Sequence, residues 1–404
     1  MTSAPQSAIA WSRKHPYERW IESLGVPIYK SYFVDDVRTL ELGVWKERGC
    51  KAAFLQLSGQ EGIAGAYVTE IQPGQTLPPF KLAIDDQVYV AQGRGITTIW
   101  AGDPSLRQAQ GELSPGRAAR RLSFEWGKRS MFLLPANTTY QLSNTSGNEP
   151  VRLLHANGLP TAMAAIADPG FYLNNPYVNV KLLHDDEADF YSEAKVFERQ
   201  GVAGGQRKVW TGNFFPDLLA WDKLDAYRER GAGGSVVFLV FPRSLHESHS
   251  HPSHMSVFPA GTYKKAHRHG PGVVIIIPGG EGFSFMWKEG EEKVLVPWHE
   301  GSVFVPPNRW FHQHFNVGEQ PARYLAIHPP TGMPVGADHF DGMVAAGEEI
   351  LDPERDQIEY PNEDPIIRET FERELAQRGL KSLMPDEAYR DKDYEWKTAA
   401  TVFA

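Results

Sequence analysis

Short apolar runs separated by turn-forming residues make up most of the middle of the chain. From about Ala53 onward, runs rich in Val, Ile, Leu and Phe are interrupted by Gly, Pro, Asn or Asp. The interruptions recur about every 8 to 12 residues, a spacing typical of an all-β sandwich or barrel. Five runs in this block are predicted strands: Tyr67 to Ile71, Gln87 to Ala91, Ile96 to Trp100, Ser130 to Leu134 and Val151 to His155.

A second strand-rich block, from Ser235 to about Pro330, repeats the pattern of the first. Met131 to Asn144 aligns without gaps on Val303 to Asn316, with Phe, Pro, Gln and Asn identical in register. A Pro-x-Arg-x-Leu segment follows each copy. Shared turn and strand positions at matching points favour two copies of one barrel over two unrelated β domains.

Helical patterns lie toward the two ends of the chain. Pro16 to Leu24 predicts a short helix, and Tyr29 to Val34 predicts a strand; together they indicate a peripheral arm. A second helix is predicted over Pro365 to Arg378, with Asp364 as its N-cap and Gly379 just past its end. The expected segments are an N-terminal arm (1–50), a first barrel (51–164), a linker (165–234), a second barrel (235–335) and an acidic, partly helical C-terminal tail (336–404).

The amino-acid composition limits which metal ligands and binding partners are possible. The 404 residues include 41 basic and 50 acidic side chains, and the resulting net charge of -9 argues against binding to a phosphate backbone. Cys50 is the only cysteine, which excludes an intramolecular disulfide and thiolate metal clusters, so a metal would need His, Asp or Glu. No run reaches the roughly 20 apolar residues of a membrane span, and Met1 to Trp11 lacks a signal-peptide pattern. We expect a cytoplasmic protein with neither membrane nor nucleic-acid partners.

Histidines gather in the second block, where ten of the fourteen lie between His246 and His328. Residues two apart on a strand point to the same face, so His267 and His269 are expected to face the barrel interior together. By the same parity, Trp310, His312 and His314 share one face. Three imidazoles from two strands can converge on one ion, with a fourth beside them.

These two clusters resemble a known family. The segment Gly-x5-His-x-His ending at His269, followed by Pro-x4-His-x3-Asn ending at Asn316, is similar to the paired motifs of the cupin superfamily in a bicupin arrangement. The resemblance implies two double-sheet jelly-roll barrels. It also implies that His267, His269 and His312 are the metal ligands.

The departures from the cupin pattern are informative. Cupins usually carry a Glu five residues after the second His, where this chain has Val274. Counting from a shared Gly, the corresponding positions of the first copy hold Phe80, Leu82, Gln87 and Tyr140. We therefore expect three neutral histidines without a carboxylate in the second barrel, and a first barrel that binds no metal.

Three-histidine cupins include thiol dioxygenases, a diketone-cleaving enzyme and the gentisate and salicylate dioxygenases, of which the last are bicupins. The resemblance implies an Fe(II)-dependent dioxygenase that inserts O2 into an aromatic or enolisable hydroxy-carboxylate. Mn, Ni and Zn are the alternative metals. Without a carboxylate ligand the ion keeps its full charge, which favours a small anionic substrate. A non-oxidative lyase or isomerase and a non-catalytic binding protein remain alternatives, and bicupins commonly form homo-oligomers.

Three further residues are candidates for catalysis. His314 would accept a substrate proton or orient oxygen, or else support a ligand from behind. Arg309 would clamp a substrate carboxylate, and Trp310 would stack on an aromatic ring or pack at the rim. The tract from His246 to His254 is interpreted as a loop or lid rather than a second metal site, because Pro252 and three serines give its histidines no common face.

Overall fold

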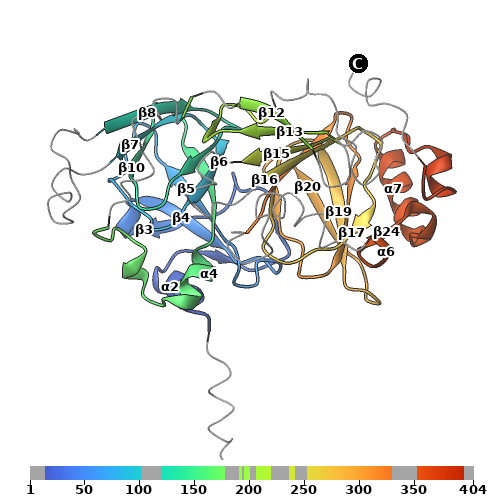
Figure 1. Ribbon diagram of the computed structural model, residues 1–404, viewed down its shortest axis with the longest axis horizontal. Helices are drawn as coiled ribbons and strands as arrows, with labels where there is room; N and C mark the ends of the chain where they lie inside the picture. The colour runs from blue at the N-terminus through green and yellow to red at the C-terminus, as the bar shows by residue number, and fades with distance from the viewer. Residues whose placement is uncertain are drawn as a thin grey trace, which may run out of the picture.

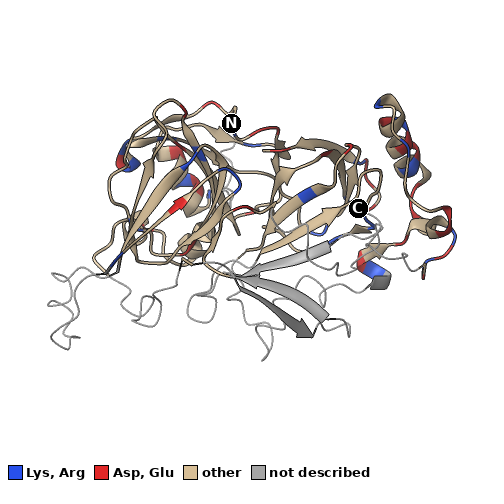
Figure 2. Cartoon of the chain, turned by 90° about the horizontal axis from the view of Figure 1, so that it is seen from above, with Lys and Arg blue, Asp and Glu red and all other residues tan. Residues whose placement is uncertain are grey.

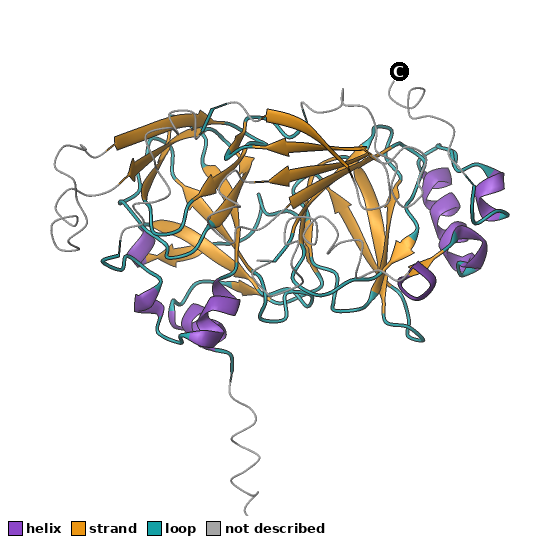
Figure 3. Ribbon diagram, viewed as in Figure 1, coloured by secondary structure: helices purple, strands orange, loops and turns teal. Residues whose placement is uncertain are grey.

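The computed structural model describes residues 14–101, 120–177, 191–192, 195–200, 206–219, 236–241, 253–329 and 353–394. Two β-barrels lie side by side, the first coloured blue to green and the second yellow to orange (Figure 1). The helices lie at the outer margins of this strand-rich body (Figure 3). The predicted all-β fold of two barrels is confirmed, and the five strands predicted in the first block are all present.

The first barrel combines an eight-stranded sheet, of order β1-β4-β5-β11-β6-β9-β14 with β3 beside β4, and a three-stranded sheet of order β10-β7-β8. Its strands are β1 (Ile28–Tyr29), β3 (Gly43–Trp45), β4 (Cys50–Leu55), β5 (Gly65–Ile71), β6 (Asp86–Gln92), β7 (Gly95–Ala101), β8 (Arg120–Trp126), β9 (Met131–Leu134), β10 (Thr139–Asn144), β11 (Val151–Asn157) and β14 (Phe214–Phe215). Alternation along β6 sends Val88 and Val90 into the barrel and Tyr89 toward the second barrel.

The second barrel pairs an eight-stranded sheet, of order β12-β13-β15-β16-β23-β18-β21-β2, with a five-stranded sheet of order β20-β19-β22-β17-β24. Its strands are β2 (Phe33–Val34), β12 (Lys195–Gln200), β13 (Gln206–Thr211), β15 (Val236–Phe241), β16 (Ser253–Phe258), β17 (Ala266–His267), β18 (Val274–Gly279), β19 (Glu281–Trp287), β20 (Val294–His299), β21 (Val303–Phe304), β22 (Phe311–Asn316), β23 (Ala322–Ile327) and β24 (Gln357–Ile358). Two strands from the predicted linker, β12 and β13, thus extend this sheet.

The N-terminal arm belongs to both barrels. Helix α2 (Pro16–Ser23) buries Tyr17, Trp20 and Ile21 in the core of the first barrel. The strand predicted over Tyr29 to Val34 forms as two short strands, because a bend at residues 31 and 32 interrupts it. One of them, β1, pairs with β4 of the first barrel, and the other, β2, pairs with β21 of the second. The arm therefore holds the two barrels together.

Apolar side chains fill the space between the two eight-stranded sheets, which face each other. Val68 and Tyr89 of the first barrel pack there with Met255, Val274 and Leu325 of the second. This shared core joins the barrels into one body.

The C-terminal tail covers the outer face of the five-stranded sheet. Helix α7 (Pro365–Gln377) packs Phe371 and Leu375 against Phe283 and Phe315. Figure 2 shows that charged residues of both signs gather on this helix, whereas most residues of the strands are uncharged. Its predicted N-cap is confirmed, because the Asp364 carboxylate accepts a hydrogen bond from the Ile366 amide.

The remaining helical segments are short: α4 (Leu159–Ala165), α6 (Pro353–Asp356), and the 3-10 turns η1 (Lys46–Arg48), η2 (Pro169–Phe171), η4 (Tyr360–Asn362) and η5 (Asp386–Tyr389). Among the described residues, no helix combines the length and apolar character needed to span a membrane.

The internal repeat seen in the sequence is a repeat of structure. Asn137 and Arg309, which the alignment matches, both adopt a left-handed backbone, with φ of 55° and 61°. Asn144 and Asn316 close equivalent turns, because each side-chain amide donates to the carbonyls of two segments and each amide oxygen accepts from a residue two positions later. Equivalent residues can therefore be compared position by position.

Candidate metal centre

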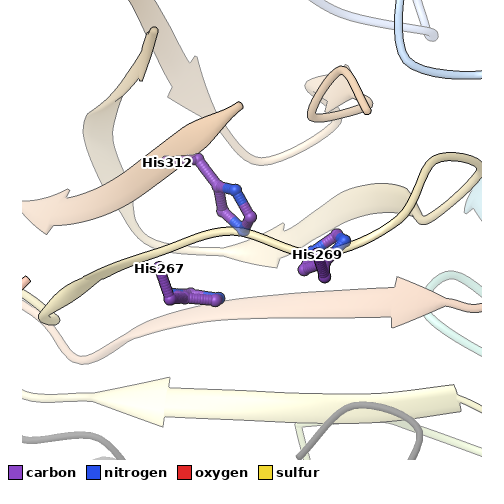
Figure 4. Close-up of side chains that lie close together, drawn as sticks. All are labelled: His267, His269 and His312. Atoms are coloured by element: carbon purple, nitrogen blue, oxygen red, sulfur yellow. The ribbon is translucent and has the colours of Figure 1, made fainter. Parts of the chain in front are cut away.

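The structure brings together the three histidines that the sequence predicts as ligands. His267 of β17 stands directly opposite His312 of β22 in the antiparallel register, and His269 follows two residues after His267. One ring nitrogen from each residue lies within 4.8 Å of those of the other two. Figure 4 shows His312 approaching His267 and His269 from a different strand. The cluster has the donor number and spacing of a site for one divalent cation.

Backbone carbonyls orient the three rings. Nδ1 of His267 lies 3.3 Å from the Lys265 carbonyl oxygen, and Nδ1 of His312 lies 3.3 Å from that of Trp310. Nδ1 of His269 lies 2.7 Å from the carbonyl oxygen of Gly270. A proton on Nδ1 donates to the carbonyl and leaves the lone pair on Nε2, the tautomer that binds a metal through Nε2. The arrangement fits a cation held by neutral imidazoles.

Because side chains alternate along β22, its histidines lie on the face of the sheet opposite the C-terminal tail. His312 and His314 of β22 face the barrel interior, and the neighbouring Phe311 and Phe315 belong to the outer core under α7. His267 and His312 are buried, and His269 is partly exposed. His267 and His312 are therefore held by a sheet that is packed on both faces, and His269 follows directly after strand β17.

The sequence predicts that Val274 occupies the position of the missing carboxylate, but the structure places Val273 there. Val274 packs in the core between the barrels, whereas Val273 packs inside the second barrel. The matching inward residue of the first barrel is Asp86, and Gln87 instead accepts a hydrogen bond from Ser253 across the barrels. The inward position of the second barrel still lacks a carboxylate, because it holds Val273.

His314 lies beside the three ligands without joining them. Its ring centroid is 5.5 Å from that of His312, and its Nδ1 lies 2.8 Å from the Ser284 hydroxyl oxygen. That hydroxyl also accepts a hydrogen bond from Nε1 of Trp298. Complete burial, reinforced by the nearby charge of Lys264, holds the pKa of His314 well below its usual value. His314 is therefore a fixed, neutral imidazole next to the site.

Arg309 and Trp310 lie on the turn that leads into β22. The amide of Arg309 donates to the carbonyl of His269, which ties the two histidine segments together. Its guanidinium pairs with the buried carboxylate of Asp356, which also binds Arg268 and Arg355. Hydrogen bonds from these arginines, with that from Arg355 the largest, hold the pKa of Asp356 below its usual range.

Trp310 is half-buried and packs against the core of the second barrel, with its ring centroid 5.8 Å from that of Tyr32. Most of the tract from His246 to His254 lies outside the described residues. Of its histidines, His254 is described, and its Nδ1 lies 2.7 Å from Nε2 of His328.

The positions of the first barrel that match His267, His269 and His312 hold Phe80, Leu82 and Tyr140. Phe80 and Tyr140 form the bridge that corresponds to His267 and His312. The guanidinium of Arg48 lies 3.9 Å above the Phe80 ring and donates to the Tyr140 hydroxyl at 2.9 Å. An arginine side chain, buried by the fold, therefore lies against the residues that replace two ligands.

Sequence reasoning missed Arg48, Asp356 and Lys264. Arg48 lies far along the chain from Tyr140, as Asp356 does from Arg268 and Arg309, so no local pattern marks these contacts. Lys264 stands three residues before His267, in the segment that carries the first histidine pair, and it is buried although its side chain is charged. The only signal in the sequence for Lys264 was its position between the strand β16 and His267.

Comparisons with known proteins add the following. No family model matches the chain, and no curated protein matches it. Among solved structures, it is similar to oxalate decarboxylase of Bacillus subtilis, at 14% identity over 73% of this chain and 76% of that chain, with a TM-score of 0.42. Oxalate decarboxylase of Lactobacillus farciminis, in a formate complex, matches at 12% identity over 73% of this chain and 85% of that chain, with a TM-score of 0.40.

The coconut allergen cocosin matches at 12% identity over 74% of this chain and 84% of that chain, with a TM-score of 0.42. At these identities and TM-scores, the likenesses decide neither a substrate nor a metal for this chain.

Proposed function

We propose that this chain is an Fe(II)-dependent dioxygenase of the three-histidine cupin type. Its substrate would be a small aromatic or enolisable hydroxy-carboxylate, and the reaction would incorporate O2 with cleavage of a ring or a C–C bond. The observation that carries the proposal is the convergence of His267, His269 and His312 with Val273, not a carboxylate, at the neighbouring inward position.

The donor set fits the metal. Imidazole nitrogens suit iron, zinc, copper and nickel, and three protein ligands leave positions open for exogenous ones. When bound, the ion would supply positive charge and open positions for two substrate oxygens and dioxygen. Because no carboxylate offsets this charge, the site favours an anionic, bidentate substrate over a neutral one.

The surrounding residues of the chain would position the substrate and exclude water. His314, held by Ser284 and kept neutral by burial, can direct a hydrogen bond toward a bound oxygen. Val273 and Ile275 line the interior with apolar surface, which strengthens electrostatic interactions there. We assign Trp310 and Arg309 to the rim, where Arg309 fixes the turn through Asp356.

Metal analysis and oxygen-electrode assays test this proposal. Protein purified without added ions is analysed for metal, loaded with Fe(II), and assayed with phenolic acids, diketones and thiols. We expect O2 uptake with a hydroxy-carboxylate and its loss in His267→Ala. His299→Ala, which changes a partly exposed histidine near Asp35, is the matched control and should keep full activity.

Two results would overturn the dioxygenase. One is a lack of O2 uptake across the whole panel by Fe(II)-loaded protein. The other is turnover that persists under strict anaerobiosis, which would identify a non-oxidative lyase or isomerase using the same three histidines.

A further inference from the structure

A lysine is buried inside the second barrel next to the histidine cluster. Lys264 is only 3% exposed. Its ammonium donates to the Ser256 hydroxyl at 2.8 Å and to the Tyr324 hydroxyl at 2.9 Å. Both partners are neutral and come from the eight-stranded sheet, on β16 and β23. The amino group is therefore held on the interior side of the barrel.

Among the described residues, no carboxylate lies within ion-pair distance of the Lys264 ammonium. The adjacent Lys265 shows the contrast, because its ammonium pairs with Glu359 of the tail. An ammonium has three donors, and the two hydroxyls supply two acceptors. A buried cation without an anionic partner destabilises the fold unless a negative charge comes from elsewhere.

In the interior of the first barrel, the chain itself supplies both a buried cation and a buried anion. Its interior holds the Arg48 guanidinium and also the Asp86 carboxylate, which binds Tyr67, His155 and Asn157. The position equivalent to Asp86 in the second barrel is Val273. The second barrel thus keeps a buried cation but lacks the internal anion.

Lys264 is close enough to the metal centre for its charge to act there. The Tyr324 ring, whose hydroxyl accepts from Lys264, has its centroid 4.7 Å from that of His314. The His314 centroid is in turn 5.5 Å from that of His312. The amide of Lys264 also donates to the His314 carbonyl at 3.1 Å. The rings of Tyr324 and His314 therefore connect the ammonium to His312 through a chain of contacts.

We propose that Lys264 is the specificity-determining residue of the site and selects a substrate whose metal-bound group is a carboxylate over one that has a neutral group in its place. The substrate's negative charge would take the part in the second barrel that Asp86 takes in the first. This inference rests on the proposed metal site, and it is independent of whether the reaction uses oxygen.

Binding measurements on the zinc-loaded protein test this role without turnover. Salicylate and its neutral amide, salicylamide, are titrated calorimetrically into wild type, Lys264→Met and Lys264→Arg, and zinc content is measured in each. Lys265→Met is the matched control, since it removes the same charge one residue away on the tail side. A variant that retains polar groups, Lys264→Gln, replaces Lys264→Met if the latter does not fold.

We expect wild type to prefer salicylate. Lys264→Met should bind salicylate about 10- to 100-fold more weakly, as for a lost charge-assisted hydrogen bond, with salicylamide binding nearly unchanged. Lys264→Arg should keep most of the preference, and Lys265→Met should keep all of it.

Equal binding of the two ligands by wild type, or a preference that survives in Lys264→Met or Lys264→Gln, would overturn the inference alone. Failure to bind zinc through the three histidines would overturn the proposed function together with it. Intact discrimination without O2 uptake by the iron form would leave Lys264 in its role and remove only the oxygen chemistry.

Discussion

The two barrels share one strand register and differ in what fills the interior. At matched positions, the first barrel pairs Phe80 with Tyr140, and the second pairs His267 with His312. In the first, Arg48 brings its guanidinium against both residues, and Asp86 supplies a buried carboxylate. The first interior thus contains its own cation and its own anion.

In the second barrel, both charges would come from bound ligands, a metal cation at the histidines and a substrate anion beside Lys264. Three imidazoles converge where a cation can bind, and Lys264 lacks a carboxylate partner among the described residues. The comparison teaches that a duplicated scaffold can be closed by its own side chains in one copy and remain open to ligands in the other.

The largest expected effect separates the two copies by metal content. His312→Ala should weaken metal affinity by more than about 100-fold, since it removes a direct ligand, whereas loss of an outer-shell partner already costs 10- to 100-fold. The equivalent change in the first barrel, Tyr140→Ala, should leave the metal content unchanged. Plasma emission analysis of both purified variants checks this, and equal metal loss in the two would break the comparison.

A second expectation concerns the internal cation of the first barrel. Arg48→Met removes a buried guanidinium, its hydrogen bond to the Tyr140 hydroxyl and its contact with the Phe80 ring, so we expect about 3 kcal/mol lower unfolding free energy. Urea denaturation followed by tryptophan fluorescence measures it, with metal content as the control that should not change. Wild-type stability in Arg48→Met would show that the guanidinium and its contacts with Tyr140 and Phe80 do not stabilise the first barrel.

A third difference between the barrels depends on pH and lies on the outer face of the five-stranded sheet. Gln313 of β22 donates to Glu363 at 3.2 Å, whereas its counterpart Gln141 donates to the Leu77 carbonyl. Burial raises the pKa of Glu363 from 4.5 to about 7, against opposing hydrogen bonds from Tyr263 and Gln313. The folded state therefore binds this proton more tightly than the unfolded chain does.

The sign of the pH effect follows from the raised pKa. The contribution of Glu363 to stability is complete below the unfolded pKa of 4.5 and is lost as the pH rises through about 7. We expect a loss of about 2 kcal/mol across this interval, reduced from the full shift because the carboxyl is partly exposed. Glu363→Gln should flatten that part of the profile, measured by thermal unfolding at several pH values. An unchanged slope would exclude Glu363 as its source.

The smallest expected effect is common to both barrels. Trp126 donates to Thr97 in the first barrel, as Trp298 donates to Ser284 in the second. Thr97→Val and Ser284→Ala each leave a buried indole N–H without an acceptor, which should cost about 1 to 2 kcal/mol. Only Ser284→Ala should also alter salicylate binding, because Ser284 contacts His314. Calorimetry on both variants sharpens the comparison, and a binding change in Thr97→Val would contradict it.

Local patterns were enough to predict most of the fold and the histidine cluster. The strands and α7 follow from apolar alternation and capping residues, and the shared faces of the two histidine clusters follow from the two-residue repeat of a strand. The choice of His267, His269 and His312 as ligands came from the motif resemblance. The inward carboxylate position was misassigned by one residue, because it was counted along the motif from His269, and that count does not fix which residue faces inward after the Gly270 to Gly272 turn, where Gly272 has a φ of 88°.

Contacts between distant segments could not be read from the sequence. The guanidinium of Arg309, which we predict to clamp a substrate carboxylate, pairs with Asp356, and the tail brings Asp356 beside the site from far along the chain. Arg48 meets Tyr140 only after the first barrel closes. The burial of Lys264 could not be predicted for the same reason, since it depends on the positions of Ser256 and Tyr324 on two other strands.

The most direct test of the central claim is anomalous diffraction from crystals of iron-loaded protein, recorded at the iron edge. The account predicts one strong peak per chain, located among the ring nitrogens of His267, His269 and His312. A peak beside Phe80 and Tyr140 in the first barrel, or no peak at the three histidines, would contradict it.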